Sequence, residues 1–312
     1  MKRTLYFGNP AYLSLRNGQM LLRLPEVEHA ENLPESFKRE AQRTFPIEDL
    51  GVVILDHRQI TITQGLLERL MENNVAVITC DSARMPAGLF LPLDGHTLQS
   101  ERFRAQIECS KPLRKQLWQQ TVQAKIMNQA NVLKRLVPEC KTGNMVAWVD
   151  EVRSDDADNL EGRAAAYYWR NLFPEIPDFV RGREGEPPNN LLNYGYAILR
   201  AVVARSLVAS GLLPTLGIHH HNKYNAYCLA DDIMEPYRPV VDTMVKEIIA
   251  ENLPWRCENL SVELKRQMLS VPTRDVKISG KQCVLAAAVD ITTTSLMKCY
   301  TGEARKIIYP EL

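Results

Sequence analysis

The sequence lacks the features of a secreted or membrane-embedded protein. Its seven cysteines are odd in number and no two form a Cys-x-x-Cys pair, which indicates reduced thiols rather than a disulfide framework or a zinc cage. No uninterrupted apolar run approaches the roughly 18 residues that a membrane helix needs. The opening residues MKRTLYFG carry charge but no apolar signal segment. We therefore expect a soluble, cytoplasmic protein with no membrane contact.

The sequence also lacks an excess of charge of either sign. Lys and Arg number 38 against 37 for Asp and Glu, so the formal net charge is +1. This balance of charge does not by itself identify a class of binding partner. A nucleic-acid-binding protein of this composition would have to gather its basic residues on one face.

The hydrophobic pattern changes once along the 312 residues and predicts an α+β protein with two domains. We expect a β-strand-rich, sandwich-like domain over residues 1–90, a linker over 91–100, and an all-α domain over 101–312, with the boundary marked by Pro86, Gly88, Pro92 and Gly95. In the first domain, the apolar pattern predicts strands at 4–7, 13–15, 20–24, 51–55, 60–62 and 75–78, with a hairpin turn at 16–18 and one helix at 64–72. The polar segment 26–43 is predicted to be a loop or a hairpin.

Helical periodicity dominates the second domain. It predicts helices at 113–137, 161–169, 193–209, 261–268 and 286–300, with a mobile loop at 181–190. The first of these helices carries five basic residues, which we interpret as a solvated face: Arg114, Lys115, Lys125, Lys134 and Arg135.

A cluster of histidines and acids is the strongest chemical signal. His219, His220 and His221 are followed by Asp232 and Glu235, whose spacing of three places both carboxylates on one face of a helix. Imidazole and carboxylate groups brought to one point bind a divalent cation. A structural alternative is a capping box, with Asp232 as N-cap and Glu235 at N3 of a helix that extends through residue 249.

Glu161 is a candidate third ligand. It lies beside Gly162 at the start of a helix whose packing side is small and apolar, and an acid on such a helix requires an explanation. The residue pattern alone leaves both the metal site and the capping box open.

Several ordered segments closely resemble the CRISPR-associated integrase family, the catalytic subunit that inserts new spacers into a repeat array. The most specific segments are 217–220 (GIHH) and 229–239 (LADDIMEPYRP). Further segments that carry the resemblance are 47–51 (IEDLG), 55–57 (LDH), 125–129 (KIMNQ), 160–165 (LEGRAA) and 192–196 (LNYGY). The resemblance covers essentially the whole chain.

The resemblance implies the fold and the partners. It implies an N-terminal β-domain that dimerises, a helical catalytic domain, and a homodimer. Two such dimers would join a dimer of a small ferredoxin-like partner in a 4:2 complex that holds double-stranded spacer-precursor DNA and CRISPR repeat DNA. The short β-domain is most similar to members from systems with the single-protein, dual-RNA-guided effector.

The resemblance also implies the active-site residues. The family's metal-binding triad falls on Glu161, His220 and Glu235, with Asp232 as a second acid, and the cofactor would be Mg²⁺ or Mn²⁺. His219 and His221 remain alternatives to His220 by a slip of one residue. Basic residues near the ligands are candidates for contacts with DNA phosphates: Arg163, Arg181, Arg183, Lys223 and Arg238. Tyr194 and Tyr196 are interpreted as core residues, with stacking on a splayed base as the alternative.

The implied reaction is transesterification, in which a DNA 3′-hydroxyl attacks a repeat phosphodiester. Two alternatives remain: a stand-alone metal-dependent nuclease that acts on branched DNA, and a non-catalytic scaffold that binds DNA.

Overall fold

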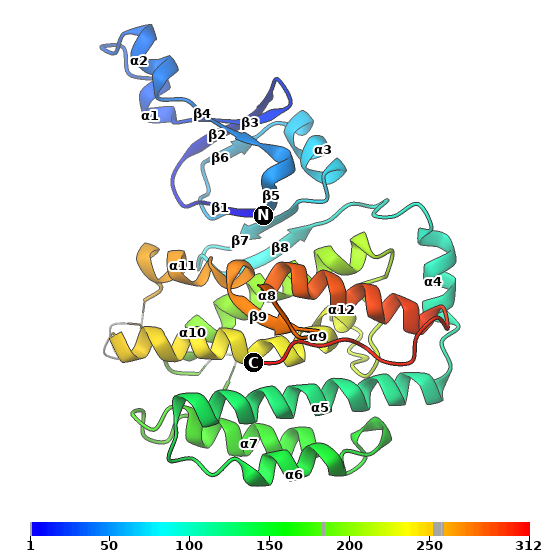
Figure 1. Ribbon diagram of the computed structural model, residues 1–312. Helices are drawn as coiled ribbons and strands as arrows, with labels where there is room; N and C mark the ends of the chain where they lie inside the picture. The colour runs from blue at the N-terminus through cyan, green and yellow to red at the C-terminus, as the bar shows by residue number, and fades with distance from the viewer. Residues whose placement is uncertain (1, 183–184, 252–256, 258) are drawn as a thin grey trace. The chain divides into compact units, whose positions relative to one another are not determined.

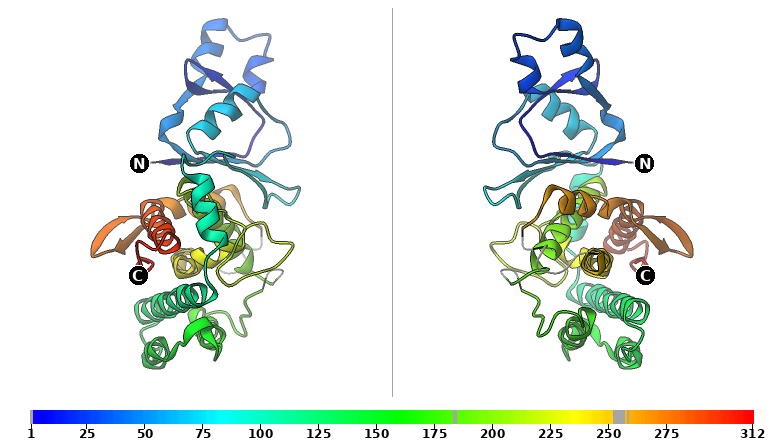
Figure 2. Two further views of the ribbon diagram at one scale, coloured as in Figure 1. Left: turned by 90° about the vertical axis from the view of Figure 1, so that its right-hand side faces the viewer. Right: turned by 90° about the vertical axis from the view of Figure 1, so that its left-hand side faces the viewer.

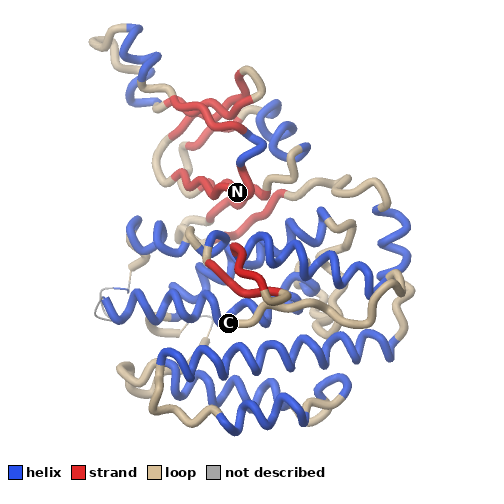
Figure 3. Tube along the Cα trace, in the orientation of Figure 1, coloured by secondary structure: helices blue, strands red, loops and turns tan. Residues whose placement is uncertain are grey.

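The computed structural model describes residues 2–182, 185–251, 257 and 259–312. The chain divides into two compact units, Met1–Asp94 and Gly95–Leu312 (Figure 1). The first unit contains two four-stranded sheets, and the second is mainly helical (Figure 3). The α+β class predicted from the sequence is therefore confirmed.

The strands predicted in the first unit are present, and β4 and β8 are two further strands that were not predicted. One sheet has the order β1-β5-β7-β8 and the other the order β4-β3-β2-β6. Their bounds are β1 Arg3–Phe7, β2 Ala11–Arg16, β3 Gln19–Arg23, β4 Arg43–Pro46, β5 Leu50–Leu55, β6 Ile60–Ile62, β7 Ala76–Cys80 and β8 Pro86–Phe90. Asn17 and Gly18 both have positive φ, 49° and 73°, as a tight β2–β3 hairpin requires.

Both sheets and one helix contribute to the core of this unit. Leu13 of β2, Val53 of β5 and Leu66 of α3 (Gln64–Glu72) belong to one buried cluster. The bounds of α3 agree with the helix predicted at 64–72. Burial of apolar side chains from three elements in one cluster is the main force that holds the two sheets together.

The prediction of a loop or hairpin over 26–43 is only partly correct, because the segment connects the antiparallel strands β3 and β4 but is not a simple loop. This segment contains two short helices, α1 (Pro25–Glu28) and α2 (Glu35–Glu40), followed by β4. Neither helix buries a residue, so neither required the apolar periodicity from which helices are predicted. The 3-10 turn η1 (Ile47–Asp49) then leads into β5.

The second unit is built on two long helices, α5 (Lys111–Leu136) and α8 (Asn189–Ala209). Helix α5 contacts α6, α7 and α10, and α8 contacts α9, α10, α11 and α12 (Figure 1). The bounds of the other helices are α4 Gln99–Ile107, α6 Gly143–Glu151, α7 Leu160–Leu172, α9 Cys228–Met234, α10 Arg238–Glu251, α11 Val262–Met268 and α12 Leu285–Tyr300, with 3-10 turns η2 Ser154–Asp156, η3 Glu235–Tyr237 and η5 Val271–Thr273.

Local sequence explains where α5 begins and which side it buries. Ser110 is its N-cap, and the Ser110 side chain accepts a hydrogen bond from the Leu113 N–H at 3.3 Å. Leu117, Val122, Ile126 and Leu133 are fully buried, as the amphipathic pattern predicts. Helix α5 therefore presents one long side to the rest of the unit.

The prediction of an all-α second domain is wrong in one place. Strands β9 (Asp275–Ile278) and β10 (Lys281–Val284) form a hairpin that projects from the helices (Figure 2). Its turn residues Ser279 and Gly280 have positive φ, 50° and 76°. Two four-residue strands are too short to give a clear alternation signal. No helix in the described part of the chain has both the length and the apolar character required to cross a membrane.

Candidate metal centre

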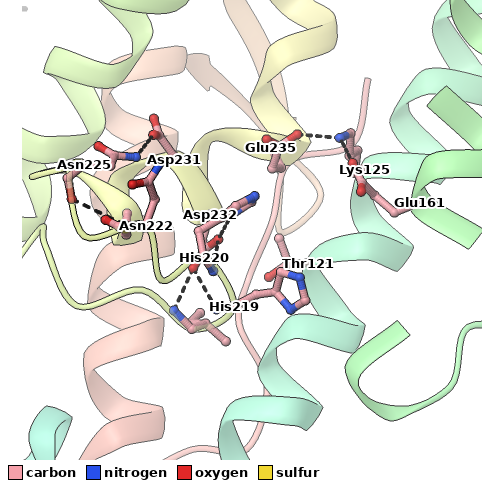
Figure 4. A network of polar contacts seen from close by, with 12 residues as sticks. Thr121, Lys125, Glu161, His219, His220, Asn222, Asn225, Asp231, Asp232 and Glu235 are labelled. Carbon is pink, nitrogen blue, oxygen red and sulfur yellow. Dashed lines mark hydrogen bonds and ion pairs between the residues drawn. The ribbon is translucent and has the colours of Figure 1, made fainter. Parts of the chain in front are cut away.

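The histidine loop is held by a single buried carboxylate. Asp232 has no exposed surface. Its Oδ2 accepts hydrogen bonds from the backbone N–H groups of Ile218 at 2.6 Å and His219 at 2.9 Å. Its Oδ1 accepts one from the His220 N–H at 3.3 Å and also bonds Nδ1 of the His220 ring (Figure 4). A carboxylate can only accept, so Nδ1 carries a proton, and in the neutral form of the ring Nε2 keeps its lone pair.

This arrangement shows that the capping-box alternative is wrong. Asp232 lies inside α9 rather than at a helix start, and its carboxylate bonds the histidine loop rather than the N-terminus of α10. The loop passes so close that Gly217 is required: a Cβ there would lie 2.3 Å from the His220 carbonyl oxygen and 2.9 Å from Asp232 Oδ2. The acid therefore positions the histidine.

A second acid holds the other end of the same loop. Asp231 is 7% exposed and forms an ion pair with Arg200, with Nε to Oδ1 at 2.6 Å. The same carboxylate accepts a hydrogen bond from Asn225 Nδ2 at 2.7 Å. Sequence reasoning did not assign roles to Arg200 or Asn225. Adjacent acids on α9 thus anchor both ends of the loop.

Glu161 is placed by the tight turn that begins α7. Asp156 accepts hydrogen bonds from the N–H groups of Leu160 and Glu161, both at 2.9 Å. Asn159, the N-cap, accepts one from the Gly162 N–H at 3.3 Å. These side chains satisfy N–H groups that the first turn of a helix leaves free, so the position of Glu161 in that turn is fixed.

Glu161 and Glu235 converge on the ammonium group of Lys125. Lys125 Nζ contacts Glu161 Oε1 and lies 2.5 Å from Glu235 Oε2 (Figure 4). Arg238 Nη2 contacts the other oxygen of Glu235 at 2.9 Å. Lys125 is 7% exposed and Glu235 is 5% exposed. Two predicted ligand residues therefore face one buried positive charge.

The interpretation of Lys125 as part of a solvated face is wrong. Lys115, Lys134 and Arg135 are exposed, whereas Lys125 lies on the buried side of α5. The available signal was its position seven residues after the buried Trp118, which places it on the same stripe. A lysine on an apolar stripe requires a partner, and Glu161 and Glu235 provide it.

The charged groups of this cluster shift one another's pKa values in favour of the charged forms. Burial acts to lower the pKa of Lys125, but Glu235 and Glu161 outweigh it, so that pKa is raised. Burial acts to raise the pKa of Glu235, but Arg238 and Lys125 outweigh it, so that pKa is lowered. The hydrogen bond to Asp232 raises the pKa of His220 against the opposing effect of burial. Glu235 is therefore a carboxylate and Lys125 an ammonium at neutral pH.

The chemistry of these residues fits a divalent cation. Within the described residues, Glu235 Oε2 is buried without a hydrogen-bond partner and faces only the charge of Lys125. His220 has the carboxylate-bonded Nδ1 that leaves Nε2 available to a metal. No three His, Cys, Asp or Glu side chains are clustered as a metal cage in the part of the chain that the structure describes. The structure thus brings Glu161 and Glu235 together and holds His220 on Asp232, while the metal triad stays a prediction.

The other two histidines have different surroundings. The ring of His219 stacks on Trp118, with centroids 4.3 Å apart and planes 7° apart, and its Nδ1 lies 3.7 Å from Asp155 Oδ1. His221 is exposed, as His220 is. The 3.7 Å separation of His219 from Asp155 is too long for a hydrogen bond, whereas the His220 ring bonds Asp232, which supports the choice of His220 as the ligand.

Asn128 joins the helix of Lys125 to the turn that carries Glu235. Its Nδ2 donates to the carbonyl of Pro236 at 2.8 Å and to that of Pro310 at 3.0 Å. One turn before Lys125, Thr121 bonds the Tyr309 hydroxyl at 2.8 Å. These residues, also missed by sequence reasoning, fix the separation of α5 and η3. Asn128 belongs to the segment 125–129 that carries part of the family resemblance.

The predicted phosphate-binding residues fall into two groups. Arg163 and Lys223 are exposed, with the Arg163 guanidinium 4.5 Å above the Trp148 ring and the Lys223 amine 4.9 Å from the Tyr224 ring. Arg181 bonds Asn189 at 2.9 Å and Asn193 at 2.7 Å, and Arg238 pairs with Glu235. Arg183 lies outside the described residues. Arg163 and Lys223 are thus the more accessible ones.

The two tyrosines are core residues. Tyr194 and Tyr196 are both buried, at 0% and 7% exposure. The Tyr196 hydroxyl donates to Asp242 Oδ1, and Tyr168 donates to Oδ2 of the same carboxylate at 3.0 Å. Burial raises the pKa of Asp242 to about 7. The stacking alternative is therefore not supported.

Comparisons by sequence find relatives of this chain among known proteins. A family model described as "CRISPR associated protein Cas1" matches residues 27–254. A CRISPR-associated endonuclease Cas1 from Neisseria meningitidis serogroup C (strain 8013) is 33% identical over 311 residues, which cover 99% of this chain and 96% of that protein.

Two solved structures share the fold. A casposase bound to integration product superimposes with a TM-score of 0.78 at 20% identity, over 98% of this chain and 92% of that one. A Cas6-RT-Cas1–Cas2 complex gives a TM-score of 0.74 at 19% identity, over 100% of this chain and 36% of that one.

Proposed function

We propose that this chain, which belongs to the CRISPR-associated Cas1 family, is a metal-dependent enzyme. It would cut and join DNA phosphodiester bonds in CRISPR adaptation. The observation that carries the proposal is the convergence of Glu161 and Glu235 on one buried positive charge, beside a histidine whose Nε2 is left available. Two carboxylates that already face one positive charge can also bind a divalent cation.

Glu161, Glu235 and His220 are the proposed ligands. The two carboxylates supply the negative charge, and the imidazole favours Mn²⁺ relative to Mg²⁺ without excluding Mg²⁺. A divalent ion bound there would stabilise the charge that gathers on the phosphoryl oxygens and would lower the pKa of an attacking hydroxyl. The physiological ion is one of these two.

The remaining residues position the ligands and the substrate. Asp232 holds the proton on Nδ1 of His220 and aligns the loop through backbone hydrogen bonds. Arg163 and Lys223, both exposed, would contact DNA phosphates. A DNA 3′-hydroxyl held in line with a repeat phosphodiester would then be joined to one strand, releasing another 3′-hydroxyl.

The partners follow from the family. We infer a homodimer formed through the β-domain, and a 4:2 complex with a small ferredoxin-like partner. The solved complex that names Cas1 together with Cas2 supports a partner of this kind. We also propose that this chain belongs to a system with a single-protein, dual-RNA-guided effector.

A strand-joining assay tests the function. A labelled DNA fragment with 3′-hydroxyl ends is mixed with a supercoiled plasmid that carries a repeat, in Mn²⁺ and in Mg²⁺. The purified protein, with its partner, should join fragment to plasmid, and Glu161→Gln, His220→Ala or Glu235→Gln should each reduce joining to background because a ligand is lost.

Glu175→Gln is the matched control. Glu175 also pairs with a lysine, Lys246 at 2.5 Å, but outside the candidate centre, so joining should persist. Cutting without joining would identify a nuclease instead. DNA binding that is unchanged by chelation, with neither cutting nor joining, would identify a scaffold.

A further inference from the structure

The space between the two acids is filled by a side chain of the protein itself. The ammonium group of Lys125 contacts Glu161 Oε1 and lies 2.5 Å from Glu235 Oε2, and the residue is 7% exposed. It projects from the middle of α5, whose position is fixed by hydrogen bonds of Asn128 to the carbonyls of Pro236 and Pro310. The lysine is therefore built into the site rather than laid over it.

A divalent ion and the Lys125 ammonium group would compete for the same carboxylate oxygens of Glu161 and Glu235. A magnesium ion requires carboxylate oxygens at about 2.0–2.1 Å in a nearly fixed octahedral arrangement. Glu235 Oε2 has the charge of Lys125 as its only described partner, and its other oxygen is already engaged by Arg238 at 2.9 Å. An ion that binds the two oxygens facing Lys125 therefore competes with the lysine for them.

We propose that Lys125 is a resident cation: it holds Glu161 and Glu235 together before a divalent ion arrives, and the ion displaces it. This inference rests on the proposed function, because it takes Glu161 and Glu235 as the metal ligands. The lysine preorganises the two acids and lowers the repulsion between them. It also makes metal binding an exchange of one cation for another, which weakens the measured affinity.

The test is calorimetric titration of Mn²⁺ into DNA-free protein, with thermal unfolding in parallel. Lys125→Met keeps the length of the side chain and removes its charge. It should bind Mn²⁺ about tenfold or more tightly than the unaltered protein, because unit charges a few ångströms apart interact strongly even at an effective dielectric constant of about 20. Without metal, the variant should unfold at a lower temperature, and saturating Mn²⁺ should reduce that difference.

Lys134→Met is the matched control. Lys134 is exposed on the same helix, nine residues from Lys125 and thus about 14 Å along its axis. Its removal deletes the same charge beyond the usual screening distance, so Mn²⁺ affinity should not change. Lys125→Gln, which keeps a hydrogen-bond donor, replaces Lys125→Met if that variant does not fold, and the same gain is expected.

Two outcomes distinguish a failure of the resident-cation inference from a failure of the proposed metal centre. If Glu235→Gln abolishes Mn²⁺ binding but the neutral Lys125 variants bind no more tightly than the unaltered protein, the resident-cation inference fails and the metal centre stands. If Glu235→Gln leaves Mn²⁺ binding unchanged, the proposed metal centre fails, and this inference fails with it.

Discussion

Replacing Asp232 by asparagine tests the anchor of the histidine loop. The Asp232 carboxylate accepts from the N–H groups of Ile218, His219 and His220 and from His220 Nδ1. Asparagine has one acceptor oxygen and one donor group. If its oxygen keeps the N–H groups of Ile218 and His219, its NH₂ faces Nδ1 of His220. That ring nitrogen must then accept, so the proton moves to Nε2 and the lone pair required by a metal is lost.

The size of the effect follows from the hydrogen bonds. Losing the charged acceptor weakens the two bonds that remain and leaves the His220 N–H unpaired, which together costs about 2–4 kcal/mol of unfolding free energy. Changing a side chain that orients a metal-binding histidine lowers metal affinity or activity by about 10–100-fold. We expect strand joining by Asp232→Asn to fall at least that far while the protein remains folded.

The assay combines joining rates with the ¹⁵N chemical shifts of the His220 ring, which report its tautomer. Asp231→Asn is the matched control, since Asp231 is its neighbour but bonds Arg200 and Asn225 rather than a histidine. It should destabilise the loop without changing the tautomer. Joining at the original rate by Asp232→Asn, with the proton still on Nδ1, would refute the reasoning.

Two further predictions concern the fold around the site. Gly217→Ala should lower the unfolding free energy by about 1–3 kcal/mol and abolish joining, because its Cβ would lie 2.3 Å from the His220 carbonyl oxygen. Gly143→Ala is the control, because its Cβ would meet nothing within 4 Å. It should change neither the unfolding free energy in urea nor the rate of joining. Burial raises the pKa of Asp242 from 3.8 to about 7, so the folded protein holds a proton that the unfolded chain releases, and unfolding free energy should fall as pH rises between those values. Asp242→Asn should remove about 3 kcal/mol of the loss between pH 5 and pH 8; equal pH dependence of the two proteins in urea unfolding would contradict this.

Long periodic elements were predictable from the sequence because their burial repeats along the chain. The helices expected at 113–137, 193–209 and 286–300 correspond to α5, α8 and α12, with ends that differ by a few residues. Helices α1 and α2 bury nothing, and strands β9 and β10 are four residues long. Helices α1 and α2 leave no periodic signal because they have no buried face, and the two buried residues of β9 alternate over too short a stretch to identify a strand.

The candidate site was only partly predictable. Family resemblance located Glu161, His220 and Glu235, which lie far apart in the sequence. It did not assign roles to Lys125, Arg200 or Asn128, because each acts through a partner more than 30 residues away. Asp232 was assigned two roles, and the structure decides between them: its carboxylate bonds the histidine loop rather than the start of a helix. Tertiary contacts of this kind are invisible to spacing rules.

The central claim is that Glu161, His220 and Glu235 bind one divalent ion. A crystal of the protein soaked in Mn²⁺ tests it most directly through the anomalous scattering of manganese. We predict one strong peak within ligand distance of an oxygen of Glu161, an oxygen of Glu235 and Nε2 of His220, with the Lys125 amine moved away from both acids. A peak elsewhere, or full manganese occupancy with these three side chains not in contact with the ion, would contradict the account.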